Sequence, residues 1–192
     1  MSKVFIGGSR KIRHLSKDIL KRIDNIINND LTVLIGDANG ADKCVQKYLF
    51  QEDYKNVIVF CTGLSCRNNM GNWETRNVEV NNNVKGFDFY TIKDREMAKE
   101  SSYGFMLWDA KSRGTLNNMI NLLKENKVVL VYFAPDQSFY KIKDAEDLAD
   151  LLSKCDPPDV RVFNEKLPIG QILAERQHER EISKALQEVL PM

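Results

Sequence analysis

Three short loops of the sequence combine glycine with side chains that can hold an anion or a sugar hydroxyl. The first spans residues 7–10 and reads Gly-Gly-Ser-Arg. Its glycines let the backbone come close to a ligand, the Ser9 hydroxyl can donate a hydrogen bond, and the Arg10 guanidinium suits phosphate. The pair of glycines could instead do no more than turn the chain after a strand. We take Gly8, Ser9 and Arg10 as candidate ligand-binding residues.

The second loop spans residues 36–42 and reads Gly-Asp-Ala-Asn-Gly-Ala-Asp at the start of a helical pattern. Small residues at a helix start leave backbone N–H groups accessible to an anion or a hydroxyl. Asp37 can accept from ribose hydroxyls, whereas Asp42, in the first turn, can instead offset the helix dipole. The candidates here are Gly36, Asp37, Gly40, Ala41 and Asp42.

The third loop spans residues 108–115 and reads Trp-Asp-Ala-Lys-Ser-Arg-Gly-Thr. A strand pattern runs directly into Ser-x-Gly-Thr, which opens a helix and presents amides and two hydroxyls at the positive end of its dipole. Trp108 offers a stacking face for a base, and Asp109 offers an acceptor for ribose. The candidates here are Trp108, Asp109, Ser112, Arg113, Gly114 and Thr115.

A polar, asparagine-rich segment at residues 62–85 lacks clear periodicity. It is long for a connection inside a domain, and loops of this length often act as lids or binding loops. In one interpretation, Arg76 reaches a phosphate and Trp73 covers a base, with Glu74 beside them. In the other, the segment is a solvated loop. The sequence leaves both open.

These loops need a scaffold, and the sequence predicts an α/β fold. Short apolar runs at residues 4–6, 31–35, 57–61, 103–108 and 128–133 alternate with helical periodicity. This alternation indicates a Rossmann-like, open and mainly parallel sheet of about five strands with helices on both faces. In such sheets ligands bind at the carboxyl ends of the strands, beside the point where the strand order reverses. We therefore expect the three loops to converge.

We expect two parts in the chain. Residues 1–135 would form the Rossmann-like, nucleotide-binding domain, and residues 136–192 a C-terminal helical extension. A helix is expected at 94–101, and the last helix at about 168–189 has a charged middle. That last helix would pack on the domain or on a second subunit, and the sequence leaves the choice open.

Composition excludes several classes. The net charge of +1, from 28 basic and 27 acidic residues, argues against a large nucleic-acid footprint, so we expect no nucleic-acid partner. The sequence has neither a Walker phosphate loop nor a G-x-G-x-x-G fingerprint, which disfavours ordinary ATPases and dehydrogenases.

Metal, membrane and cofactor signals are also missing from the sequence. Four cysteines without a C-x-x-C pair and two histidines make no zinc set, so we expect reduced thiols, no metal and no cofactor. No apolar run approaches the roughly 18 residues that span a bilayer, and the first residues enter a strand directly. We expect a cytoplasmic protein without membrane contact.

Together the three loops resemble the SLOG superfamily, the Rossmann-like group that contains LOG-type nucleoside-monophosphate phosphoribohydrolases and DNA-processing protein A. The resemblance covers roughly residues 3–134 and looks closest to the small stand-alone branch related to YspA and YpsA. Besides the loops, it includes Arg76-Asn77, Lys93-Asp94 and the run at residues 104–109.

The resemblance implies a site for a nucleotide-derived ligand and, in LOG-type members, cleavage of the N-glycosidic bond. Those enzymes carry Pro-Gly-Gly-x-Gly-Thr-x-x-Glu with a catalytic glutamate, and the corresponding position here holds Asn118. An amide can neither accept a proton nor carry a full negative charge. Asp37, Glu74 and Asp109 are the carboxylates that could replace the glutamate.

Three functions therefore stay open. The first is binding of a nucleoside phosphate, cyclic nucleotide or ADP-ribose-like ligand as a sensor or carrier, by a chain that forms a homo-oligomer. The second is an N-glycosidase, phosphoribohydrolase or deoxyribosyltransferase acting on a nucleoside monophosphate. The third is binding of single-stranded DNA through a local basic patch with tryptophan stacking. That patch would comprise Arg10, Lys11, Arg13 and Arg76 with Trp73 or Trp108.

Overall fold

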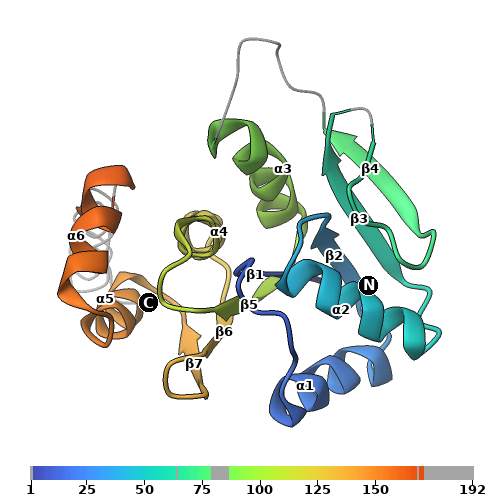
Figure 1. The fold of residues 1–192 in the computed structure, drawn as a ribbon, viewed down its shortest axis with the longest axis horizontal. Coiled ribbons are helices and arrows are strands. Elements are labelled where there is room, and N and C mark those ends of the chain that lie inside the picture. Colours follow the sequence, from blue (N-terminus) through green and yellow to red (C-terminus); the bar gives the residue numbers. More distant parts are fainter. Residues whose placement is uncertain (1, 64, 79–86, 168, 171–192) are drawn as a thin grey trace, which may run out of the picture.

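The computed structural model describes residues 2–63, 65–78, 87–167 and 169–170, and a seven-stranded sheet forms its centre (Figure 1). The strand order is β4-β3-β2-β1-β5-β6-β7. Every neighbouring pair is parallel except β6 and β7. The predicted α/β, Rossmann-like and mainly parallel sheet is thus confirmed. The strands are β1 (Lys3–Gly8), β2 (Thr32–Gly36), β3 (Val57–Thr62), β4 (Glu74–Val78), β5 (Tyr103–Trp108), β6 (Val129–Phe133) and β7 (Ser138–Ile142).

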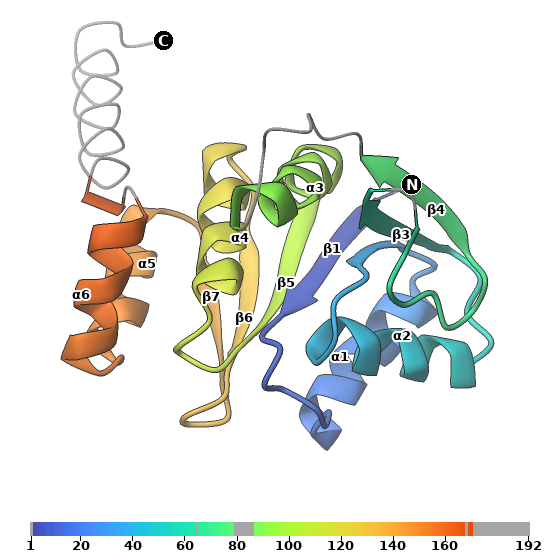
Figure 2. The ribbon, with the colours of Figure 1, turned by 45° about the horizontal axis from the view of Figure 1, so that its top comes forward.

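Helices cover both faces of this sheet (Figure 2). Successive side chains of a strand point to opposite faces, so Val4 and Ile6 pack in the hydrophobic cluster with α1 and α2, while Phe5 packs in the cluster with α3 and α4. No described helix is long and apolar enough to cross a membrane. The helices are α1 (Lys17–Asn28), α2 (Ala41–Gln51), α3 (Phe87–Glu100), α4 (Arg113–Lys124), α5 (Ala145–Ser153) and α6 (Pro157–Lys166).

The two edge strands of the sheet, β4 and β7, were not predicted. The sequence of β4 is Glu-Thr-Arg-Asn-Val and that of β7 is Ser-Phe-Tyr-Lys-Ile, so neither forms an apolar run. An edge strand has one strand neighbour and half-exposed side chains, which removes the pattern that identifies buried strands. The expected helix at 94–101 is the second half of α3.

The C-terminal part is not purely helical, because β7 pairs with β6. The expected boundary near residue 135 falls between these two hydrogen-bonded strands. Leu148 of α5 and Phe163 of α6 lie in the same hydrophobic cluster as Trp108 and Phe133 of the sheet. The helix expected at about 168–189 lies outside the described residues, apart from 169–170.

The order of the strands places a switch point between β1 and β5. From β1 the chain builds β2, β3 and β4 on one side, then returns through α3 to add β5, β6 and β7 on the other. Gly8, at the end of β1, is in register with Leu107 of β5. The crevice beyond the carboxyl ends of these two strands is where an open α/β sheet binds its ligand.

The cysteines differ from the expected set of reduced thiols. Cys61, on β3, and Cys66 are joined by a disulfide, with their Cα atoms 5.1 Å apart. Cys44 and Cys155 are free thiols.

Candidate functional site

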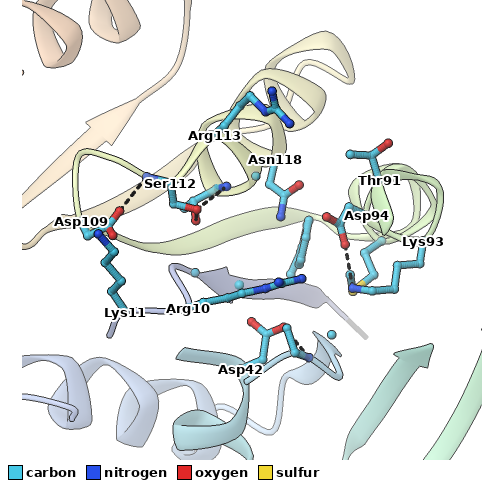
Figure 3. A pocket seen from close by; sticks show the side chains of 18 of the residues that line it. Arg10, Lys11, Asp42, Thr91, Lys93, Asp94, Asp109, Ser112, Arg113 and Asn118 are labelled. Atoms are coloured by element: carbon cyan, nitrogen blue, oxygen red, sulfur yellow. Dashed lines mark hydrogen bonds and ion pairs between the residues drawn. The ribbon is translucent and has the colours of Figure 1, made fainter. Parts of the chain in front are cut away.

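A pocket of about 470 Å³ opens at the switch point (Figure 3). Its wall includes the loops after β1, β2 and β5, the side chain of Arg67, and residues of α3 and α4. Arg10 extends into the pocket from the loop after β1 (Figure 3), and Asp42 of α2 and Lys93 of α3 both lie close to Gly36. The candidate residues that line it are Gly8, Arg10, Gly36, Asp42, Asp109, Ser112, Arg113, Gly114 and Thr115.

Hydrogen bonds tie the three predicted loops together. The Ser9 hydroxyl donates to Asp109 Oδ1 at 2.8 Å and lies 3.3 Å from Thr115 Oγ1. The Ala41 amide donates to the Ser9 carbonyl at 3.2 Å. The loops after β1, β2 and β5 therefore meet at one place, although about a hundred residues of chain separate the first from the last.

These and neighbouring bonds engage the Ser9 and Ser112 hydroxyls and one carboxylate oxygen of Asp109, all of which we assigned to a ligand. Asp109 Oδ1 accepts from the amides of Lys111 and Ser112 at 3.1 and 2.7 Å, besides the Ser9 hydroxyl. Ser112 Oγ is the N-cap of α4 and accepts from the Thr115 amide at 3.3 Å. Ser9, Asp109 and Ser112 therefore hold the backbone in place at the N-terminus of α4.

Asp37 is buried and bound by Arg67 rather than presented to a ligand. The Arg67 guanidinium donates to Oδ1 at 2.6 Å and to Oδ2 at 3.0 Å, and the Arg67 amide donates to Oδ2 at 3.0 Å. Burial alone would raise the pKa of Asp37, but these bonds and the charges of Lys93 and Arg67 lower it. The expected ribose-binding and catalytic roles are corrected: Asp37 fixes Arg67 in the pocket wall.

Two glycines permit close approaches that a side chain would block. Gly40 has φ +90°, and a Cβ there would lie 2.4 Å from the Arg10 backbone. A Cβ at Gly36 would lie 2.6 Å from Asp42 Oδ2 and 2.7 Å from Lys93 Nζ. Glycine is therefore required at residue 40, where the second loop passes the first, and at residue 36, where the loop passes Asp42 and Lys93.

Asp42, Lys93 and Asp94 place three charges in one part of the pocket lining, which we call the floor. Lys93 Nζ donates to Asp94 Oδ1 at 2.8 Å, and Asp42 Oδ2 accepts from the Ala38 amide at 3.2 Å. Burial raises the pKa of Asp42 to about 6, although the charge of Lys93 opposes this. Burial alone would lower the pKa of Lys93, but attraction to Asp94 and Asp42 raises it.

Asn118 connects α4 to this floor. In the amide orientation that satisfies both of its polar atoms, its nitrogen donates to Asp94 Oδ2 at 3.1 Å and to the Gly114 carbonyl at 3.2 Å. The residue that replaces the LOG-type glutamate therefore lies in the pocket and holds Asp94.

Both tryptophans lie outside the lining of the pocket. Trp108 is fully buried against Phe133 and Phe163, with ring centroids 5.6 and 6.0 Å away, and its indole donates to the Ser112 carbonyl at 3.0 Å. Trp73 is buried as well, and its indole donates to the Tyr54 carbonyl at 2.8 Å. Their expected role of stacking on a base is corrected, because both side chains are buried and neither lines the pocket.

Glu74 and Arg76 also lie away from the pocket, on the edge strand β4. Arg76 pairs with Glu100, lies 3.7 Å from Glu74 and stacks 5.1 Å over the Phe60 ring. Their expected roles in catalysis and phosphate binding are corrected, since β4 is three strands from the switch point. Of the three carboxylates proposed to replace the glutamate, Asp109 alone lines the pocket, and its Oδ1 is held by the Ser9 hydroxyl and two backbone amides.

Residues outside the predicted set complete the lining. Lys93 and Asp94 entered the sequence analysis only through the family resemblance, and Lys111 sat in the third loop without a role. Arg67 lies in the polar segment, where nothing in the sequence pointed to Asp37. The basic lining residues of the described chain are Arg10, Lys11, Arg67, Lys93, Lys111 and Arg113, and the acidic ones are Asp42, Asp94 and Asp109.

The lining is therefore positive, and the arrangement suits an anion. The amides at the start of α4 add a partial positive charge, because the helix dipole is positive at its N-terminus. Gly114 leaves this end open, since a Cβ there would meet nothing closer than 4.0 Å. Within the described residues, no group of three or more His, Cys, Asp or Glu side chains is placed to hold a metal ion.

Comparisons with known proteins identify a similar fold. No family model and no curated protein matches the sequence. Among solved structures, the fold is similar to that of DNA processing protein A from Helicobacter pylori, a protein with a single-stranded DNA binding mode. The match has a TM-score of 0.52 at 18% sequence identity, and it covers 68% of this chain and 64% of that one.

This likeness contradicts our prediction that the chain has no nucleic-acid partner. That prediction rested on the net charge of +1, which sums over the whole chain and hides the local excess of basic side chains at the pocket. The likeness agrees with the Rossmann-like fold that the SLOG resemblance implies. Membership of the SLOG superfamily, and of a branch within it, stays a prediction.

Proposed function

We propose that this chain binds single-stranded DNA and holds one nucleotide of the strand at the pocket. The observation that carries the proposal is the positive lining of a pocket at the switch point of the sheet. Phosphate contacts supply most of the affinity of such binding, and arginine is the side chain best suited to them. Lys111 and Arg113 lie at the start of α4 and Arg10 extends into the same pocket, and these three side chains would contact the phosphate.

The size of the pocket limits how much of the strand it can hold. A volume of about 470 Å³ suits one nucleotide rather than a run of bases. With few phosphates neutralised, affinity should fall only moderately with salt, at about 0.7 log units per phosphate contact for each log unit of salt. This is also consistent with a net charge near zero.

Fluorescence anisotropy with a labelled single strand of about 20 nucleotides tests the proposal. We expect the double variant Arg10→Ala, Arg113→Ala to bind about tenfold more weakly and with a smaller salt dependence. The matched control is Lys17→Ala, Lys21→Ala, which removes the same charge from exposed positions of α1. Its affinity should stay within about twofold.

Two results would overturn the proposal. One is the absence of binding by the unmodified chain at about 50 mM salt, where phosphate contacts are strong. The other is equal weakening by both double variants, because this would indicate attraction to the overall charge rather than to the pocket. Thermal unfolding of each variant verifies that the fold is retained.

A second candidate is binding of a free nucleotide-derived ligand, such as a nucleoside phosphate, a cyclic nucleotide or an ADP-ribose-like molecule. The volume of the pocket favours it, since small-molecule sites commonly occupy about 300–1,000 Å³. Thermal shifts against a panel of these compounds test it, because a ligand at 100 times its Kd adds about 2.7 kcal/mol. Stabilisation by a nucleotide together with no strand binding would favour this candidate over the first.

A further inference from the structure

The buried charges on the floor of the pocket have hydrogen-bonding capacity to spare. Asp42 is 7% exposed and Lys93 is 4% exposed, yet both line the pocket. An ammonium has three donors and a carboxylate about four acceptor sites. Among the described residues, Lys93 donates only to Asp94, and Asp42 accepts only from the Ala38 amide.

Asp42 and Lys93 also lie next to each other without pairing. Both Asp42 Oδ2 and Lys93 Nζ lie close to Gly36, because a Cβ added to this residue would be 2.6 Å from the first atom and 2.7 Å from the second. Within the described part of the chain, however, the ion pair of Lys93 is with Asp94 and not with Asp42. An acceptor and a donor therefore stand side by side, in the space that a side chain at residue 36 would otherwise take, and both line the pocket.

The floor carries two carboxylates and one ammonium, a net charge of −1, and therefore disfavours a phosphate at this end of the pocket. Two carboxylates, Asp42 and Asp94, would repel a phosphate there, whereas the basic side chains at the start of α4 would attract it. A ligand with one anionic and one neutral end would thus turn its neutral end to the floor. A nucleotide has this form, and its base edge carries a donor beside an acceptor.

We propose that Asp42 and Lys93 form a base-reading subsite, in which a nucleobase of the bound strand places its polar edge on the floor of the pocket while its phosphate stays at α4. This inference rests on the proposed function. The Asp42 carboxylate accepts from an N–H of the base, and the Lys93 ammonium donates to the adjacent ring nitrogen or carbonyl. Both residues act in specificity and neither needs to act in catalysis.

Two labelled single strands of equal length test this subsite: one of deoxycytidine and one made of abasic nucleotides. We expect the unmodified chain to bind the deoxycytidine strand about tenfold more tightly, the size of one good polar contact to a base edge. Asp42→Asn should reduce this preference, the ratio of the two affinities measured for the same variant, to less than about threefold. Lys93→Gln should reduce the preference in the same way.

Asp18→Asn is the matched control, because Asp18 occupies the first turn of α1 as Asp42 does that of α2 but is exposed. It should keep the full preference. Equal binding of both strands by the unmodified chain, or an undiminished preference in Asp42→Asn, overturns the subsite and leaves the proposed function standing. Failure of both strands to bind overturns the proposed function and the subsite together.

Discussion

The Ser9 hydroxyl donates to Asp109 Oδ1 at 2.8 Å, and the Asp109 amide donates back to Ser9 Oγ at 3.1 Å. This reciprocal pair joins the ends of β1 and β5, the two strands between which the strand order reverses. The pair closes the base of the candidate site by means of two residues of the chain itself. It therefore matters to the shape of the pocket more than to direct contact with a ligand.

Replacing Ser9 should destabilise the fold. Ser9 is fully buried, so Ser9→Ala leaves the Asp109 amide without its acceptor and should lower the free energy of unfolding by about 1–3 kcal/mol. Urea denaturation measures this. Ser138→Ala, at an exposed hydroxyl, is the control and should change the free energy by less than about 0.5 kcal/mol. Equal effects of the two substitutions would contradict the role given to Ser9.

Replacing Arg67 should lower the free energy of unfolding, because it removes the partner of Asp37. Arg67→Ala leaves a carboxylate that is 1% exposed without its partner and should cost about 3–5 kcal/mol at pH 7. Because the pKa of Asp37 is lowered from 3.8 in the folded chain, its stabilising effect is present above pH 3.8 and is lost as the pH falls through the lower value.

The deficit of Arg67→Ala should therefore shrink in acid. Chemical denaturation at pH 7 and at about pH 3 measures it. Arg161→Ala, at an exposed position on α6, is the control and should be nearly neutral at both. A deficit that is the same at both pH values would show that Arg67 stabilises the fold by packing and not through the Asp37 carboxylate.

Asp42→Asn should stabilise the fold at neutral pH. Burial raises the pKa of Asp42 from 3.8 to about 6, against Lys93 and with Asp94 and Asp37 nearby. Its charge therefore opposes folding fully above pH 6, progressively less between pH 6 and 3.8, and not at all below. The free energy of unfolding of the variant should exceed that of the unmodified chain by on the order of 1–3 kcal/mol at pH 8, and the two should be equal near pH 3. Urea denaturation at the two pH values measures this. A variant that is less stable at pH 8 would contradict this.

Gly36→Ala should block the floor of the pocket. The added methyl group would lie within 2.7 Å of both Asp42 Oδ2 and Lys93 Nζ, so both side chains must move. We expect loss of the preference for a base over an abasic site, measured by anisotropy, with a modest decrease in Tm. Gly170→Ala is the control, because a Cβ there meets nothing within 4 Å. Unchanged discrimination in Gly36→Ala would show that the ligand does not reach the floor.

The sequence was sufficient to predict the strands in the buried part of the sheet. Strands such as β3 and β5 are continuous apolar runs because both of their faces are covered, and the three glycine-bearing loops follow from where such strands end. The edge strands β4 and β7 were missed because polar side chains dominate them. Strand pairing at an edge depends on a neighbour that is distant in the sequence, which local pattern cannot supply.

The direction in which side chains point was the second feature that the sequence could not predict. Trp108 ends a strand next to the pocket, but a strand position does not reveal which face its side chain takes, and this one turns toward Phe133. Asp37 was correctly placed in a loop near the site, yet its partner Arg67 is 30 residues away in a segment without periodicity. Roles that depend on such distant pairs required the folded chain.

The most direct measurement of the central claim is a titration of the ¹⁵N-labelled chain with a short single strand, followed through its glycine amides. We expect Gly8, Gly36 and Gly114 to shift together and to saturate, because all three line the pocket. Gly104 and Gly170 lie elsewhere and should not move. Shifts confined to these last two, or no shifts at all at millimolar strand, would contradict binding at the pocket.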